Sequence, residues 1–354
     1  MNERFRSALL GTALGDAWGY PYQESPQPEC TPLPEILTIS DDTQMTLALS
    51  TAMRTIVSSN LGREDGMRII GEQFLEYHAD PEYDRSPGAA TTESLDRLED
   101  LGTAHWEDVS THSGGAGAVM RVAASALLAP SDEGVGWSVM QAILTHDSGI
   151  ARGSAAAMAT LMLAPRGANL LDVAEGLAGD AHFDNDHLLT DKEKSQTLED
   201  FNHAMISDVQ GNAVPLSEIF ARVREVHKFL SPRLAEGEFE DLYTHGSKLM
   251  KIFGKGYDAG SCTASALLLA QLYLDHHDQY APHDFLHVAV SWPGNRNTRA
   301  SVTGAMIGAH LDSAEVWEES CSYEFEERYN GAIHSGVWKG FKKTPMPEHE
   351  TADN

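Results

Sequence analysis

The chain has 354 residues, of which 42% are hydrophobic and 22% charged, and its formal net charge is −28. This composition is typical of a globular protein and excludes a chain that is disordered throughout. The negative charge disfavours sequence-independent binding to nucleic acid. The chain contains no apolar run of about 18 residues, so we predict no membrane span.

The N-terminus lacks a hydrophobic stretch of signal-peptide length, because a glycine and a threonine interrupt the apolar residues 8–14. The cysteines Cys30, Cys262 and Cys321 are far apart and form no C-x-x-C pair. This spacing argues against a disulfide framework and against a structural zinc site. We therefore expect a cytoplasmic protein.

Apolar residues recur at helical spacing along most of the chain, beginning with residues 3–18, a segment rich in alanine and glycine. A loop over residues 20–39 follows. Further helices are predicted over residues 42–58, 64–79, a short stretch ending near 101, a stretch after 121, and residues 135–144, 150–164, 259–275, 283–291 and 299–311.

Residues from about 167 to 250 are more polar and less regular, and we expect helices joined by long loops there. Residues 344–354 are polar, include two prolines, and are predicted to be a disordered tail. Alternation with a period of two residues, which is typical of strands, is nearly absent. The sequence therefore predicts a compact all-α protein with a single domain over residues 1–343.

Two adjacent acids, Asp41 and Asp42, stand between the hydroxyl residues Ser40 and Thr43, immediately before an apolar helix. Such residues are common helix caps. Their carboxylate and hydroxyl oxygens also suit a hard cation such as Mg²⁺ or Mn²⁺. The segment by itself leaves both interpretations open.

Three other segments combine polar or glycine residues with the end of a predicted helix. Asn295, Asn297 and Thr298 could supply neutral oxygens to a cation, or could form a turn and a helix cap. The glycine-rich residues 114–117 could hold a phosphate or merely make a turn. His146, at a helix interruption, could contact a ligand or be a hydrogen-bonded core histidine.

Together, and in order, these segments resemble the ADP-ribosylglycohydrolase family, which includes dinitrogenase-reductase-activating glycohydrolases and ADP-ribosyl-acceptor hydrolases. Residues 11–19 resemble its opening G-x-x-x-G-D-A-x-G segment, and residues 40–43 its (S/T)-D-D-T motif. Residues 115–121 resemble the G-x-G-x-x-M-R loop, Thr145-His146 the T-H segment, and residues 294–298 the late G-D-x-D-(S/T) motif. The resemblance implies the family's orthogonal multi-helix fold and hydrolysis of the glycosidic bond between ADP-ribose and an acceptor.

The resemblance also implies a binuclear Mg²⁺ or Mn²⁺ centre. Its ligands would be Ser40, Asp41, Asp42, Asn295, Asn297 and Thr298, with Asp41 or Asp42 accepting a proton from water. At the positions of Asn295 and Asn297 the family has aspartates. At the position of Gln23, near the ligand, it usually has a glutamate. Because divalent-ion affinity depends on ligand charge, the sequence leaves two ions, one ion or none open.

On the ligand side, the resemblance implies that Gly115, Gly117, Ala118 and Val119 contact the diphosphate and ribose of ADP-ribose. His146 matches a histidine that contacts the ligand, and Gly88 resembles part of a loop near the ribose.

Three hypotheses remain open from the sequence. The protein could be a metal-dependent glycohydrolase, a degenerate member that binds ADP-ribose, a related nucleotide or another protein without turnover, or a structural protein with no ligand. An arginine, a serine, a nucleic-acid base and a small molecule all remain possible acceptors.

Overall fold

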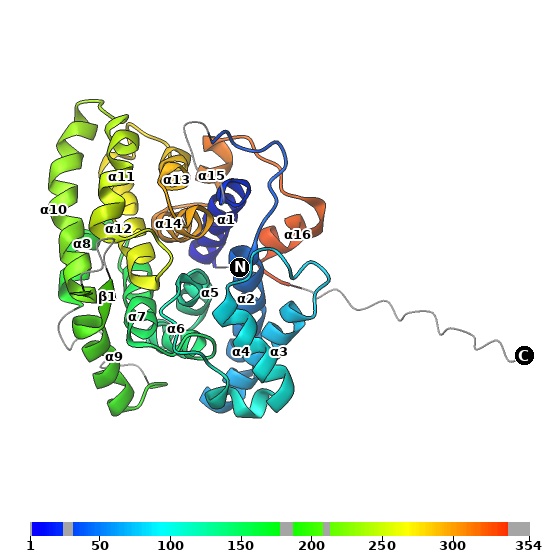
Figure 1. Ribbon diagram of the computed structural model, residues 1–354. Coiled ribbons are helices and arrows are strands. Elements are labelled where there is room, and N and C mark those ends of the chain that lie inside the picture. The colour runs from blue at the N-terminus through cyan, green and yellow to red at the C-terminus, as the bar shows by residue number, and fades with distance from the viewer. Residues whose placement is uncertain (1, 24–30, 178–186, 208–212, 339–354) are drawn as a thin grey trace, which may run out of the picture.

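The computed structural model describes residues 2–23, 31–177, 187–207 and 213–338, and it is built almost wholly of α-helices (Figure 1). The prediction of an all-α fold is confirmed. The helices are α1 (Glu3–Gly19), α2 (Asp41–Ser59), α3 (Arg63–His78), α4 (Ala89–Leu101), α5 (Val122–Leu128), α6 (Gly134–Ile143), α7 (Gly149–Leu163), α8 (Leu170–Gly176), α9 (Asp191–His203), α10 (Leu216–Ala235), α11 (Asp241–Phe253), α12 (Ala259–His276), α13 (Pro282–Ser291), α14 (Arg296–His310), α15 (Glu315–Ser320) and α16 (Glu327–Ser335).

Most predicted helices lie within two or three residues of their observed positions. The polar region from about 167 to 250 contains α8 to α11 and one short antiparallel strand pair, β1 (Met205–Ser207) and β2 (Ala213–Pro215). The short helices α15 and α16 were not predicted. The predicted tail, residues 344–354, and the predicted domain end at residue 343 lie outside the described residues.

Helices α1 and α14 pack side by side near the middle of the molecule, between α10 and α11 on one side and α3 and α4 on the other (Figure 1). Glycines allow this close approach. A Cβ atom added at Gly15 would lie 2.2 Å from the carbonyl oxygen of Ala300, and one added at Gly11 would lie 2.2 Å from that of Gly304. No side chain fits at such distances, so the small-residue pattern of the first helix reflects contact between two helix backbones.

This packing places the start of α14 beside the end of α1. A Cβ atom added at Gly19, the last residue of α1, would lie 2.4 Å from the Cα atom of Asn297. A cluster of buried apolar side chains that extends from Phe5 to Trp338 surrounds the pair. Among the helices of the described ranges, none has the length and apolarity needed to cross a membrane.

Candidate active site

Asp16, in the last turn of α1, holds the beginning of α2. Its buried carboxylate accepts hydrogen bonds from the backbone N–H groups of Ser40 and Thr43, at 2.9 and 3.1 Å. The hydroxyl groups of the same two residues donate to it at 2.5 and 2.6 Å. The first turn of α2, which carries Asp41 and Asp42, is therefore fixed relative to α1, and its free N–H groups are satisfied.

Asp42 joins this turn to the start of α14. Its Oδ2 atom accepts hydrogen bonds from the side-chain amide of Asn297 at 2.9 Å and from the hydroxyl of Thr298 at 3.1 Å. The same amide donates to Oγ of Ser40 at 3.1 Å. The structure therefore brings the first acidic segment and the late asparagine-containing segment into direct contact, since α14 begins at Arg296 rather than at the predicted residue 299.

Two oxygen atoms at this contact lack a hydrogen bond. Oδ1 of Asp42 and Oδ1 of Asn297 are both buried, and neither has a partner among the residues that the structure describes. A buried acceptor without a partner is costly, and a hard cation is one group that would satisfy both oxygens. Within the described ranges, no three His, Cys, Asp or Glu side chains form a metal-binding group, so any ion here needs neutral ligands as well.

Asp16, Asp41 and Asp42 also share one buried region. Burial raises the pKa of Asp16. The pKa values of Asp41 and Asp42 lie well above the usual aspartate value, because of burial and then because of the negative charge of Asp16. The nearby positive charge of Arg121 lowers the pKa of Asp41 less than burial and Asp16 raise it, so three ionised carboxyl groups would need further positive charge here.

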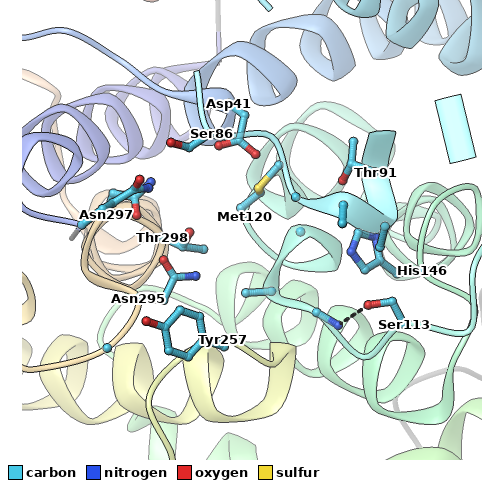
Figure 2. A pocket seen from close by; sticks show the side chains of 18 residues that line it. Asp41, Ser86, Thr91, Ser113, Met120, His146, Tyr257, Asn295, Asn297 and Thr298 are labelled. Atoms are coloured by element: carbon cyan, nitrogen blue, oxygen red, sulfur yellow. Dashed lines mark hydrogen bonds between the residues drawn. The ribbon is translucent and has the colours of Figure 1, made fainter. Parts of the chain in front are cut away.

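A cavity of about 500 Å³ opens beside these acids (Figure 2). It is lined by nine of the residues that the sequence singles out, namely Gln23, Asp41, Gly88, Gly115, Gly117, His146, Asn295, Asn297 and Thr298. Four others, Ser40, Asp42, Ala118 and Val119, are buried and do not line it. Asp41 and the glycine-rich loop therefore line the same cavity.

The glycine-rich loop is held against the start of α12. The N–H group of Ala116 donates to the carbonyl oxygen of Tyr257 at 2.9 Å, and that of Ala259 donates to Gly114 at 2.8 Å. A Cβ atom added at Gly117 would lie 2.7 Å from Cε1 of His146. Glycine is thus required at this position for the loop to pass over the histidine ring.

His146 is 3% exposed, and its Nδ1 atom lies 2.8 Å from the hydroxyl oxygen of Thr145. Burial, followed by the nearby positive charge of Arg121, lowers the pKa of His146 to about 3. The imidazole is therefore neutral at physiological pH, and it presents a polar edge to the cavity without adding a charge.

Several residues that line the cavity were not predicted from the sequence, including Ser86, Ser113 and Tyr257. Ser113 could have been found, because it adjoins the glycine-rich loop. Tyr257, which is 62% exposed, follows two glycines just before the buried helix α12, and that pattern is a weak signal. Asp16 belongs to the recognised opening segment, but its role depends on contacts with residues far along the chain.

Comparison with known proteins agrees with this arrangement. The family model for ADP-ribosylglycohydrolase matches residues 1–322. A solved structure named as an ADP-ribosylglycohydrolase-related protein complex has the same fold, with a TM-score of 0.54, 18% sequence identity and 95% of each chain covered. A search of curated proteins finds no match. The extent of the family match shows that this chain belongs to the ADP-ribosylglycohydrolase family.

Proposed function

We propose that the protein hydrolyses the glycosidic bond that joins ADP-ribose to an acceptor, and that one divalent cation assists it. The observation that carries this proposal is the cavity of about 500 Å³ that Asp41, Gly115 and Gly117 all line. This volume lies within the range of small-molecule sites. The substrate class is inferred from membership of the family, and the residues that line the cavity would contact that substrate.

The glycine-rich loop is the part of the cavity that suits a diphosphate. Gly115 and Gly117 expose backbone rather than side chains there, so phosphate oxygens can approach the chain closely. His146 offers a neutral ring edge beside them. The ribose and its bond to the acceptor would then lie toward Asp41.

Asp41, Asp42, Ser40 and Asn297 would hold one Mg²⁺ or Mn²⁺ ion. The buried, unpartnered oxygens of Asp42 and Asn297 support this assignment, as does the raised pKa of both aspartates, which burial and the charge of Asp16 cause. Bound there, the ion would orient ribose hydroxyls and water and stabilise developing charge. A second ion is disfavoured because Asn295 and Asn297 bring no charge.

Asp41 is the residue best placed to act as general base. It lines the cavity, whereas Asp42 is turned toward Asn297 and Thr298. Asp41, ionised when the cation is bound, would accept a proton from the water that attacks the anomeric carbon of the ribose. The bond to the acceptor then breaks, and the acceptor leaves with its bonding electron pair and takes up the proton that Asp41 removed from the water.

The test is release of ADP-ribose from arginine-, serine- and nucleotide-linked substrates by the full chain with Mg²⁺ or Mn²⁺. We expect turnover on one linkage, and a loss of at least about 100-fold in Asp41→Asn. Asp132→Asn, in an exposed loop, is the matched control and should retain full turnover. Absence of turnover on all three linkages, with ADP-ribose still bound, would overturn the proposal.

The second candidate function is binding of ADP-ribose without turnover. It is favoured by the hydrogen bond from the Asn297 amide to Asp42, which occupies a carboxylate oxygen that a metal would otherwise use. A variant that combines Gln23→Glu, Asn295→Asp and Asn297→Asp distinguishes the two functions. If only these acids are missing, the variant gains turnover that the natural chain lacks.

A further inference from the structure

Arg121 is a fully buried cation beneath the glycine-rich loop. Its Nε atom donates to the side-chain oxygen of Gln141 at 2.5 Å, and a terminal nitrogen donates to the carbonyl oxygen of the same residue at 3.0 Å and to the hydroxyl of Thr145 at 2.6 Å. The guanidinium carbon lies 4.8 Å from the centre of the Phe74 ring. Arg121 forms no ion pair within the described part of the chain, so its hydrogen bonds go to neutral groups.

A guanidinium group can only donate hydrogen bonds, and this fixes the direction of the hydrogen bond between Thr145 and His146. Because Thr145 accepts from Arg121, one lone pair of its oxygen is used. Its single hydroxyl hydrogen faces Nδ1 of His146 at 2.8 Å, and no other acceptor for it is found among the described residues. If the ring donated instead, the buried hydroxyl hydrogen would have no acceptor, which is costly.

Nδ1 of His146 therefore accepts a hydrogen bond, and the ring hydrogen is on Nε2. That nitrogen faces the glycine-rich loop, since Cβ atoms added at Gly115 and Gly117 would lie 3.2 and 3.0 Å from it. The ring lines the cavity, as Figure 2 shows. No described residue accepts a hydrogen bond from Nε2, although the ring is 3% exposed.

We propose that Arg121 and Thr145 are positioning residues that hold His146 as a neutral Nε2–H donor for an acceptor oxygen of the ligand. The opposite tautomer would present a lone pair to that oxygen and repel it. The identity of the ligand, ADP-ribose, rests on the proposed function, whereas the direction of the hydrogen bonds does not. The acceptor is a phosphate oxygen or a ribose hydroxyl, which a neutral donor serves equally well.

The first experiment reads the tautomer directly. Ring ¹⁵N–¹H spectra of the histidine-labelled full chain are recorded at about pH 7, and the signal of His146 is identified by its loss in His146→Gln. We expect the Nε2–H tautomer in the natural protein and in Thr145→Ser. Thr145→Val, which lacks the hydroxyl, should remove the hydrogen bond to Nδ1 and move the ¹⁵Nδ1 resonance toward that of a lone pair without a hydrogen bond. A hydrogen on Nδ1 in the natural protein, or an unchanged spectrum in Thr145→Val, would overturn the proposal.

The second experiment measures binding of ADP-ribose and of adenosine by calorimetry. Thr145→Val and His146→Leu should each weaken ADP-ribose binding by about tenfold, whereas Thr145→Ser, which keeps the hydroxyl, should not. His146→Gln, which keeps a donor, should lose less affinity than His146→Leu. An equal loss with adenosine assigns the acceptor to the ribose of the adenosine part, whereas a loss seen only with ADP-ribose assigns it to a phosphate or to a hydroxyl of the terminal ribose. If the natural protein binds neither ligand, the proposed function fails and the tautomer measurement alone decides this proposal.

Discussion

The side-chain amide of Asn297 donates a hydrogen bond of 2.9 Å to Oδ2 of Asp42, and so connects the start of α14 to the start of α2. An amide group can provide this contact, whereas an ionised carboxylate cannot. The asparagine therefore stabilises the acidic pair without a metal ion. An aspartate in its place would need a cation between the two side chains.

Replacing Asn297 with aspartate should make the stability of the protein depend on metal. In the presence of a chelator, Asn297→Asp loses the amide donor and adds a buried acid, and we expect the free energy of unfolding to fall by about 2–3 kcal/mol. Saturating Mn²⁺ should restore much of this loss, because a ligand that binds only the native state stabilises it. Urea denaturation with and without Mn²⁺ measures both effects.

The matched control is Asn295→Asp, which places the same new charge in the same cavity. The amide of Asn297 still donates to Asp42 in this variant, so its stability in chelator should stay close to that of the natural protein. Equal stability of Asn297→Asp and the natural protein in chelator would contradict the interpretation of the Asn297–Asp42 contact.

Gly15→Ala should disrupt the packing of α1 against α14. The added Cβ atom would lie 2.2 Å from the carbonyl oxygen of Ala300, and backbone cannot move as freely as a side chain. We expect a loss of about 3 kcal/mol in the free energy of unfolding. Gly331→Ala, in α16, adds the same methyl group where no atom lies within 4 Å, and should stabilise the protein by about 0.5–1 kcal/mol.

Gly117→Ala should impair ligand binding. Its Cβ atom would lie 2.7 Å from Cε1 of His146, so that the loop or the ring must move. We expect ADP-ribose affinity to fall by at least about tenfold, measured by calorimetry. The control is Gly88→Ala, which adds a methyl group to the same cavity with no protein atom within 4 Å. A comparable loss of affinity in that variant would mean that the added methyl groups collide with the ligand, and that displacement of His146 is not the cause.

Two buried histidines should make the protein less stable in mild acid. Burial is the main cause that lowers the pKa of His146 to about 3 and that of His310 to about 4. Between pH 6.5 and 4, the unfolded chain binds a proton on each residue that the native protein does not bind. The free energy of unfolding therefore falls with decreasing pH, by about 1.4 kcal/mol per pH unit for each histidine.

The measurement compares urea denaturation of the natural protein and of the double variant His146→Gln, His310→Gln at several pH values. Taking the difference between the two proteins cancels the contribution of the many acidic residues. The two slopes should differ between pH 6.5 and 4 and agree near pH 8. Parallel slopes over the whole range would show that these histidines are not held neutral in the native state.

The sequence predicts the long, apolar helices well, because burial imposes a helical spacing on segments such as α2 and α12. It misses the short polar helices α15 and α16, where tertiary contacts rather than apolar spacing decide the structure. The start of α14 was placed three residues late, because Arg296 and Asn297 are polar yet buried at 2% and 1% exposure. The single-domain boundary at residue 343 stays a prediction.

For the site, the motifs identify residues in consecutive stretches but not the partners that hold them. Asp42 and Asn297 were both singled out, and the structure adds the bond between them. The role of Asp16 could not be predicted, because its hydrogen bonds to Ser40 and Thr43 arise only when α1 and α2 come together. For the same reason, the direction of the bonds from Arg121 to His146 required their three-dimensional arrangement.

The contact between α1 and α14 also constrains the order of events during synthesis. The glycine face of α1 leaves the ribosome early, whereas its partner helix follows only after residues 20–295, which take about 15–55 s to make. During that interval Gly11 and Gly15 have no native partner, and Asn297 does not yet exist to meet Asp42. The cavity therefore cannot be completed in a nascent chain that ends before α14, and chaperones have time to bind the exposed first helix.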